Sequence, residues 1–339
     1  MYGSFLSNRL KLKTLIVAFA LSCSGIQKPD LDITAQVYIE NVHVDGDTLG
    51  VPTHIGFFNN IEIISDLINS RFLYREKGRI NWLKSPIALK GQHSLTFANG
   101  LYYVNDTNNH RIISFQDISK SDIEQVSSIS GIKLKRPHDI LFNPDDGFLY
   151  VIDENKYLLR FKHFGEGEEK LDLRSVIGYA RSLSLVNGKV YVINSSKGQV
   201  IQIDNFNAGK WIVYQSYGKK KTDYSGTWET TGLVFNDVEF YNGYWYGSNM
   251  FVRPDDNISV NYNRFRLIRW KSWTDFERGT WEELSHLLPD DTVPYYFTIH
   301  KFELYIAVIS FNDSPLYAGI YEIIDAKKLK TSIGYRSVL

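Results

Sequence analysis

The sequence has little that would cross-link the chain or give it a charged character. It contains one cysteine in 339 residues, and its 38 basic and 38 acidic residues leave no formal net charge. A mature chain without a disulfide depends on packing for its stability. Balanced charge argues against binding to nucleic acid or to a membrane surface. The sequence also lacks a phosphate-binding loop, a Gly-x-Ser-x-Gly motif and a cysteine-based metal motif.

A basic and then apolar segment opens the chain. Its apolar core, residues 15–21, is too short to span a bilayer. We therefore predict a signal sequence over residues 1–22 and a polar tether over residues 23–35. The stretch ending at Cys23 resembles the lipid-attachment box of bacterial lipoproteins, which implies a lipid on Cys23 and membrane attachment through it. Ordinary signal cleavage near Ser22 is the alternative. Both interpretations predict an exported protein, periplasmic or extracellular. If Cys23 carries a lipid, the protein would be an outer-membrane lipoprotein.

Residues 136–161 contain a clear strand pattern. Three runs within them are rich in Leu, Tyr, Val, Ile and Phe, which favour buried strands. Pro, Gly, Asp and Asn separate the runs at residues 143–147 and 153–156, as tight turns require. A meander of three or four strands cannot bury both faces alone, so it needs copies of itself as neighbours.

The same pattern occurs six times along the chain. The inner strands of the copies begin at residues 54, 93, 138, 181, 236 and 296. A repeat of about 40 to 60 residues made of short strands is typical of a β-propeller. We therefore predict an all-β protein, a six-bladed β-propeller with four-stranded blades over residues 36–326. The lysine-containing segment 327–339 would form a C-terminal tail.

The sixth repeat has no obvious outer strand of its own. Propellers commonly close by pairing an N-terminal strand with the last blade, which covers two exposed edges. Residues 36–42 are largely apolar, and we assign them this closing role. The outer strands of the other blades are expected near residues 80–83, 126–129, 171–173, 211–214 and 281–284.

Two insertions interrupt the repeat. Residues 216–234 join blades four and five, and residues 250–263 split the middle strands of blade five. In a propeller both kinds of loop lie on the face where the inner strands begin, which we call the mouth of the channel. Long loops on a rigid scaffold commonly carry function, although drift in loop length explains them equally well.

Aligning the repeats places six side chains at the channel mouth. In chain order these are His54, His93, His138, Arg181, Asn236 and Tyr296. Three histidines at equivalent positions, beside Asn236 and Asp237, predict a metal or acid–base cluster. Neutral imidazoles suit zinc, iron or copper, whereas Asn and Asp oxygens suit calcium. The alternative is a ring of polar residues filled with water.

Several motifs resemble known propellers. The turns at residues 66–71 and 106–111 resemble NHL repeats, in which Asp and Asn satisfy the backbone of the turn, and this implies a propeller over most of the chain. The motif around His138 and the one around His93 resemble the zinc-binding repeats of the peptidyl-hydroxyglycine amide lyase propeller. That resemblance implies that both histidines are metal ligands and that Arg181 or a channel tyrosine is a catalytic partner.

A further resemblance concerns blade five. Residues 236–238, followed by residues 246–249, are similar to paraoxonase and gluconolactonase propellers, in which the asparagine binds a catalytic calcium. The sequence departs from that pattern on blade one, where His54 stands instead of an acidic ligand.

These observations support two hypotheses. The first is a metal-assisted hydrolase or lyase at the channel mouth, in which a divalent metal, zinc or calcium, polarises a substrate oxygen or supplies hydroxide. Its metal ligands would be His54, His93, His138 and Asn236. Its catalytic groups would be Arg181, Tyr296 and Asp237. The second hypothesis is a non-catalytic propeller that binds a glycan, peptide or protein, and the fold alone does not decide between them.

Overall fold

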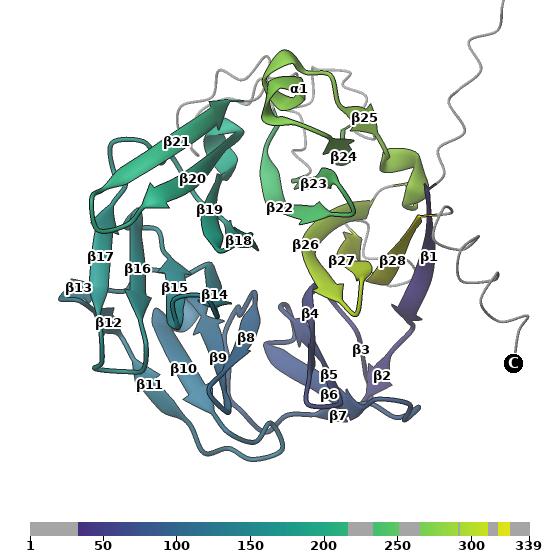
Figure 1. The fold of residues 1–339 in the computed structure, drawn as a ribbon. Coiled ribbons are helices and arrows are strands. Elements are labelled where there is room, and N and C mark those ends of the chain that lie inside the picture. The colour runs from purple at the N-terminus through teal and green to yellow at the C-terminus, as the bar shows by residue number, and fades with distance from the viewer. Residues whose placement is uncertain (1–32, 216–232, 251–264, 291, 311–317, 326–339) are drawn as a thin grey trace, which may run out of the picture. The chain divides into compact units, whose positions relative to one another are not determined.

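The computed structural model describes residues 33–215, 233–250, 265–290, 292–310 and 318–325. The described residues form six four-stranded antiparallel sheets arranged in a ring (Figure 1). Blade one consists of β4 (Pro52–Phe58), β5 (Ile61–Asp66), β6 (Arg71–Glu76) and β7 (Leu83–Lys84). Blade two consists of β8 (Leu95–Ala98), β9 (Leu101–Asp106), β10 (Arg111–Phe115) and β11 (Glu124–Val126). Blade three consists of β14 (Asp139–Asn143), β15 (Phe148–Ile152), β16 (Tyr157–Phe161) and β17 (Glu169–Asp172).

The second half of the ring follows the same plan. Blade four consists of β18 (Ser182–Val186), β19 (Lys189–Asn194), β20 (Gln199–Asn205) and β21 (Lys210–Gln215). Blade five consists of β22 (Phe235–Tyr241), β23 (Tyr244–Asn249), β24 (Leu267–Trp270) and β25 (Glu282–Glu283). Blade six consists of β26 (Thr292–His300), β27 (Glu303–Ser310), β28 (Gly319–Asp325) and β1 (Ile33–Glu40). The predicted six-bladed β-propeller is therefore confirmed.

The N-terminal strand closes the ring, as predicted. β1 pairs antiparallel with β28, from Ile33 opposite Asp325 to Glu40 opposite Gly319 (Figure 1). The strand covers residues 33–40, so it begins three residues earlier than the predicted segment 36–42 and ends two residues earlier. The outer strands β7, β11, β17, β21 and β25 each overlap or border the predicted stretch.

The core lies between neighbouring blades. One cluster combines Tyr103 and Ile112 of blade two with Leu149, Val151 and Leu159 of blade three, all fully buried. Because a blade has a neighbour on each face, the sequences of its middle strands are continuously apolar and do not alternate between apolar and polar residues. For this reason the repeat could be detected in the sequence.

A polar contact repeats at the end of the second strand in blades one to five. The side-chain oxygen there accepts a hydrogen bond from a backbone N–H of the segment that leads to the inner strand of the same blade. Asp106 accepts from Lys90 at 2.7 Å, and Asn194 accepts from Gly178 at 3.0 Å. The equivalent residues in the other blades are Asp66, Asp153 and Asn249. These contacts fix the approach to the inner strands of these blades, and therefore position the side chains at the mouth.

A few short elements lie outside the repeat. They are two hairpins, β2 (His43–Val44) with β3 (Asp47–Thr48) and β12 (Ser128–Ile129) with β13 (Ile132–Lys133), the helix α1 (Trp273–Arg278), and the 3-10 turns η1 (Thr107–Asn109), η2 (Ser195–Lys197) and η3 (Ser285–Leu287). None of the described helices has the length and apolar character that crossing a membrane requires.

Several predictions lie outside the described residues. They concern the signal segment, the lipid on Cys23, the C-terminal tail and both insertions apart from residues 233–234 and 250.

Candidate functional site

Two tiers of residues line the start of the channel. We assign residues to the two tiers by the register in which each inner strand pairs with the second strand of its blade. The mouth tier consists of Thr53, His93, His138, Arg181, Asn236 and Tyr295. The lumen tier, one residue further along each strand, consists of His54, Ser94, Asp139, Ser182, Asp237 and Tyr296.

The structure places two predicted mouth residues, His54 and Tyr296, one position deeper than the alignment of the repeats did. The hairpin turns give the correct alignment. Phe58, Ala98 and His300 are the last paired residues of their inner strands, so the residues four positions earlier, His54, Ser94 and Tyr296, are equivalent. The repeats of blades one and six were therefore aligned one residue out of register with His93. The other four predicted residues keep their tier.

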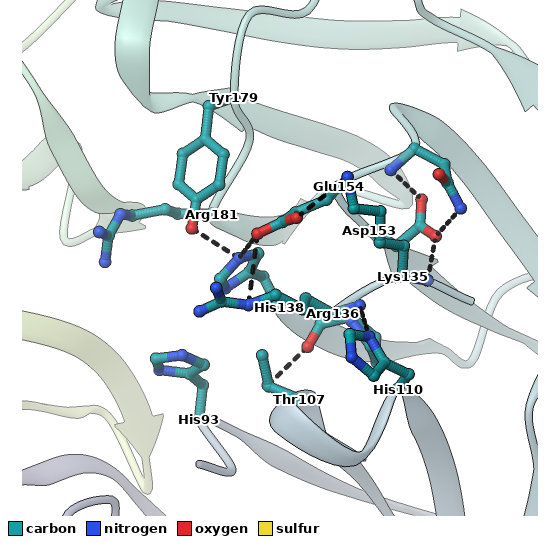
Figure 2. Close-up of polar contacts among 12 residues, drawn as sticks. His93, Thr107, His110, Lys135, Arg136, His138, Asp153, Glu154, Tyr179 and Arg181 are labelled. Atoms are coloured by element: carbon teal, nitrogen blue, oxygen red, sulfur yellow. Dashed lines mark hydrogen bonds and ion pairs between the residues drawn. The ribbon is translucent and has the colours of Figure 1, made fainter. Parts of the chain in front are cut away.

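The mouth tier contains a compact group of polar side chains. The imidazole rings of His93 and His138 have centroids 5.2 Å apart. The Tyr295 hydroxyl lies 3.1 Å from Nδ1 of His93 and accepts a hydrogen bond from Nη1 of Arg181 at 2.9 Å. His93, His138 and Arg181 are 8%, 2% and 7% exposed, and Figure 2 shows them next to one another.

Two loop residues complete the surroundings of His138 (Figure 2). The Tyr179 hydroxyl lies 2.6 Å from Nε2 of His138. The nearest Glu154 oxygen is 3.9 Å from the same nitrogen, and Nε of Arg136 lies 3.3 Å from that oxygen. Nδ1 of His138 is buried and has no hydrogen-bond partner among the described residues. We call His93, His138, Tyr179, Arg181 and Tyr295 the mouth cluster. Tyr179, Glu154 and Tyr295 were not singled out from the sequence.

Burial controls the charge of the two histidines. It lowers the pKa of His138 to about 4; the Arg181 and Arg136 charges act in the same direction, whereas Glu154 opposes them. Burial also holds the pKa of His93 well below its ordinary value, with the His138 and Arg181 charges adding to the effect. Both imidazoles are therefore neutral near neutral pH, so each has a nitrogen that can accept a proton.

The remaining mouth-tier side chains bond to the backbone. The Thr53 hydroxyl donates to the carbonyl of His93 at 2.8 Å. The Asn236 amide donates to the carbonyl of Pro294 at 2.9 Å, which ties blade five to blade six. Both residues therefore join neighbouring inner strands.

The lumen tier also ties blades together. Oδ2 of Asp139 accepts a hydrogen bond from the backbone N–H of Leu183 at 2.7 Å, and Oδ2 of Asp237 accepts one from Phe297 at 2.9 Å. Each carboxylate thus holds the inner strand of the following blade. The Tyr296 hydroxyl lies 3.2 Å from the carbonyl of His138 and 2.8 Å from that of Arg181, within reach of both.

Comparisons place the fold among known propellers. No family model matches the sequence, and no curated protein matches it. A catalytically inactive virginiamycin B lyase from Staphylococcus aureus, solved with quinupristin, matches with a TM-score of 0.57 and 11% identity over 86% of this chain and 99% of that one. A putative gluconolactonase matches with a TM-score of 0.57 and 11% identity over 86% and 91%. A chain of the nidogen/laminin complex matches with a TM-score of 0.50 and 11% identity over 74% and 92%.

The chain shares their fold. At these identities the likeness shows the architecture alone, and propellers of this kind include both enzymes and binding proteins. The function must therefore be argued from the side chains of this chain.

The predicted metal ligands do not surround one point. Among the described residues, no group of three or more His, Cys, Asp or Glu side chains is arranged to hold a metal ion. His54 lies in the lumen tier, one position deeper than His93 and His138. Of the predicted ligands, His93 and His138 present neighbouring imidazoles. The donor set thus does not fit the predicted four-ligand site, and no step below depends on a metal.

Proposed function

We propose that this propeller is an enzyme, a hydrolase or lyase, with an acid–base site in the mouth cluster and a small anionic molecule as substrate. The observation that carries the proposal is the contact between the Tyr179 hydroxyl and Nε2 of the buried, neutral His138, with Arg181 in the same cluster.

The Tyr179–His138 pair can transfer a proton. In the tautomer that carries its proton on Nδ1, His138 accepts a hydrogen bond from the Tyr179 hydroxyl. The tyrosine oxygen can then take a proton from the substrate while its own proton passes to Nε2. Hydrolysis begins with proton removal from water, and elimination begins with proton removal from carbon, so the same pair serves either reaction.

Charge at the mouth favours an anionic substrate. Arg181 and Arg136 both lower the pKa of His138. An anion bound beside Arg181 would offset that positive charge and raise the pKa of His138 toward the working pH, where a general base is most effective. The substrate anion would thereby both bind at the mouth and increase the basicity of the site.

Turnover of a panel of small esters, lactones and amides that carry a carboxylate tests the proposal. We expect His138→Ala and Tyr179→Phe each to lower kcat by about 100-fold or more, the usual contribution of a general acid or base. His163→Ala is the matched control, because His163 lies on the outer turn of blade three and is partly buried. Full activity in both mouth variants contradicts the proposal.

A divalent metal stays a prediction. Elemental analysis of the purified protein tests it directly, and stoichiometric zinc or calcium that is lost in His138→Ala, with an unchanged circular dichroism spectrum, would support it. Binding of the metal through His138 requires the neutral imidazole, so affinity should fall as the pH drops through the pKa of that histidine.

The second candidate function is a non-catalytic binding propeller for a glycan, peptide or protein. One observation favours it: the side chains of His93, His138 and Arg181 are almost fully buried and already bonded within the protein. This alternative would be supported if the protein turned over no compound in the panel and the intact chain retained a partner.

We also propose that the protein is exported, because its N-terminal segment has the pattern of a signal sequence. If Cys23 carries a lipid, the wild-type protein should fractionate with membranes and Cys23→Ser should become soluble. A wild-type protein that is already soluble contradicts the lipid anchor.

A further inference from the structure

A cavity of about 280 Å³ lies within the ring, beyond the mouth cluster. All six inner strands contribute to its wall, which includes lumen-tier residues but no residue of the mouth cluster. At its other end the wall includes Ile299, which is 44% exposed, so the cavity reaches the surface near the end of β26. We call this space the lumen cavity; it is separate from the proposed acid–base site.

The wall of the lumen cavity is acidic. Asp139, Asp237 and Glu239 line it, whereas no lysine or arginine is among its lining residues. The two imidazoles in the wall do not balance this charge, because burial lowers the pKa of His54 to about 4 and also lowers that of His300. A buried carboxylate without a positive partner is unfavourable. Burial consequently raises the pKa of all three carboxyl groups, and a cation beside them would favour their charged forms.

Another part of the wall is apolar and partly aromatic. Phe57, Phe58 and Phe297 line it together with several aliphatic side chains. Aromatic faces attract cations, and apolar walls accept a hydrocarbon body.

One polar atom of the wall lacks a partner. Nδ1 of His54 is buried and has no hydrogen bond to any described residue. Buried polar atoms are nearly always satisfied, so an unsatisfied one beside a cavity points to a group that the protein itself does not provide. In its neutral form this imidazole can donate to or accept from a bound ligand.

We propose that the lumen cavity binds a small organic cation, a protonated amine with an apolar body. The carboxylates would hold the ammonium group and the phenylalanine rings would enclose the body. A bare metal ion fits less well, since no three His, Cys, Asp or Glu side chains among the described residues converge at ligand distance. Binding of this cation goes beyond the proposed reaction at the mouth and does not depend on it.

Glu239 is the best residue for a test. Its Oε1 accepts a hydrogen bond from the backbone N–H of Phe240, within the same strand, whereas Asp139 and Asp237 hold neighbouring blades. Burial raises the pKa of Glu239 to about 7, with the Asp139 charge adding to the effect. An ammonium group beside it would relieve this penalty.

Calorimetry with benzylamine as the probe tests the proposal on the intact chain. We expect millimolar or tighter binding of benzylamine, no comparable binding of the neutral isostere benzyl alcohol, and about tenfold or greater weakening in Glu239→Gln. Glu124→Gln, at an exposed position on β11, is the matched control and should bind like wild type. Equal binding of both probes, no binding of benzylamine, or an unaffected Glu239→Gln would overturn the proposal.

A second variant keeps the test valid if Glu239→Gln does not fold. Thr96→Lys places an ammonium group on the wall of the lumen cavity and should abolish benzylamine binding by occupying the site. Benzylamine binding should be unchanged in His138→Ala, which separates this proposal from the proposed function. Glu239-dependent binding of calcium in place of benzylamine would overturn the assignment to an organic cation.

Discussion

Among the described residues, Asp153 lacks the arginine partner that pairs with the equivalent aspartates of blades one and two. At the same position in blades one and two, Asp66 and Asp106 form ion pairs with Arg71 and Arg111, at 2.9 and 2.7 Å. Asp153 has hydrogen-bond donors around it but no ion pair with an arginine among the described residues. Burial consequently raises its pKa to about 6, although the hydrogen bonds act in the opposite direction. The carboxylate of Asp153 is therefore a weak point of blade three.

Asp153→Asn should stabilise the protein at higher pH. Because the pKa of Asp153 in the folded state, about 6, lies above its ordinary value, the stability linked to its proton is present in acid and is lost as the pH rises through 6. Asparagine cannot lose that proton and keeps one acceptor oxygen, as Asn194 does in blade four. Its amide nitrogen replaces an oxygen that accepts hydrogen bonds in blade three, which reduces the gain. We expect a gain on the order of 1 kcal/mol above neutral pH that disappears in acid. Urea unfolding across this pH range tests it, with exposed Asp145→Asn as the control; a difference independent of pH contradicts it.

Two channel tyrosines should respond differently to removal of the hydroxyl. The Tyr296 hydroxyl lies within reach of two backbone carbonyls, at 3.2 and 2.8 Å, whereas the Tyr179 hydroxyl contacts Nε2 of His138. Tyr296→Phe should lower the free energy of unfolding by about 1–3 kcal/mol, because buried carbonyls lose their donor. Tyr179→Phe should instead lower kcat with little loss of stability, because Tyr179 is only partly buried. Urea unfolding and turnover measured on both variants test this; the reverse pattern would assign the proton-transfer role to Tyr296.

The sequence pointed to about half of the mouth cluster. His93, His138 and Arg181 stood out because they begin three successive repeats. Tyr179 and Glu154 did not, because they lie in connecting segments whose contacts have no period. Tyr295 was missed because the sixth repeat was aligned one residue out of register: counted back from the hairpin turn after β26, Tyr296 corresponds to Ser94 and Tyr295 to His93.

At the scale of elements, the strands were more predictable than the segments between them. The second strand of a blade is buried on both faces, so its apolar run and its terminal Asp or Asn are both visible in sequence. The helix α1 was not expected, although Ser272 and Asp275 form a capping box at its start. It lies between β24 and the two-residue β25.

Trp273 of α1 should contribute strongly to the junction of blades four and five. Its ring stacks on Tyr214 of β21, with centroids 4.0 Å apart, and lies 4.4 Å from that of Trp245 in β23. We expect Trp273→Ala to lower the free energy of unfolding by roughly 2–3 kcal/mol, somewhat less than a fully buried tryptophan, because Trp273 is partly exposed. Thermal melts of this variant and of Trp82→Ala, whose ring packs under Arg75 in blade one, provide the comparison. Equal losses in the two variants would contradict a special role for α1.

At the scale of the whole molecule, the ring depends on one junction between distant parts of the chain. Every other blade is built from consecutive strands, whereas blade six pairs β28 with β1. The Tyr38 hydroxyl of β1 also donates to Glu62 of blade one at 2.8 Å, so β1 connects the last blade to the first. Closure of this kind was predictable because an open sixth blade would leave exposed strand edges.

Removal of β1 should destabilise the entire propeller rather than blade six alone. Ile33 and Ile39 of β1 are 2% and 5% exposed, so its loss uncovers apolar surface as well as the hydrogen-bonding edge of β28. Deletion of residues 28–42 should lower the melting temperature by roughly 5 °C or more. A chain that lacks residues 1–27 but keeps β1 is the matched control and should melt like the full-length protein. Because each blade packs on both of its neighbours, we expect one cooperative transition at the lower temperature. Circular dichroism and tryptophan fluorescence should report this transition at the same temperature. An unchanged melting temperature after the deletion would show that the ring is held closed without β1.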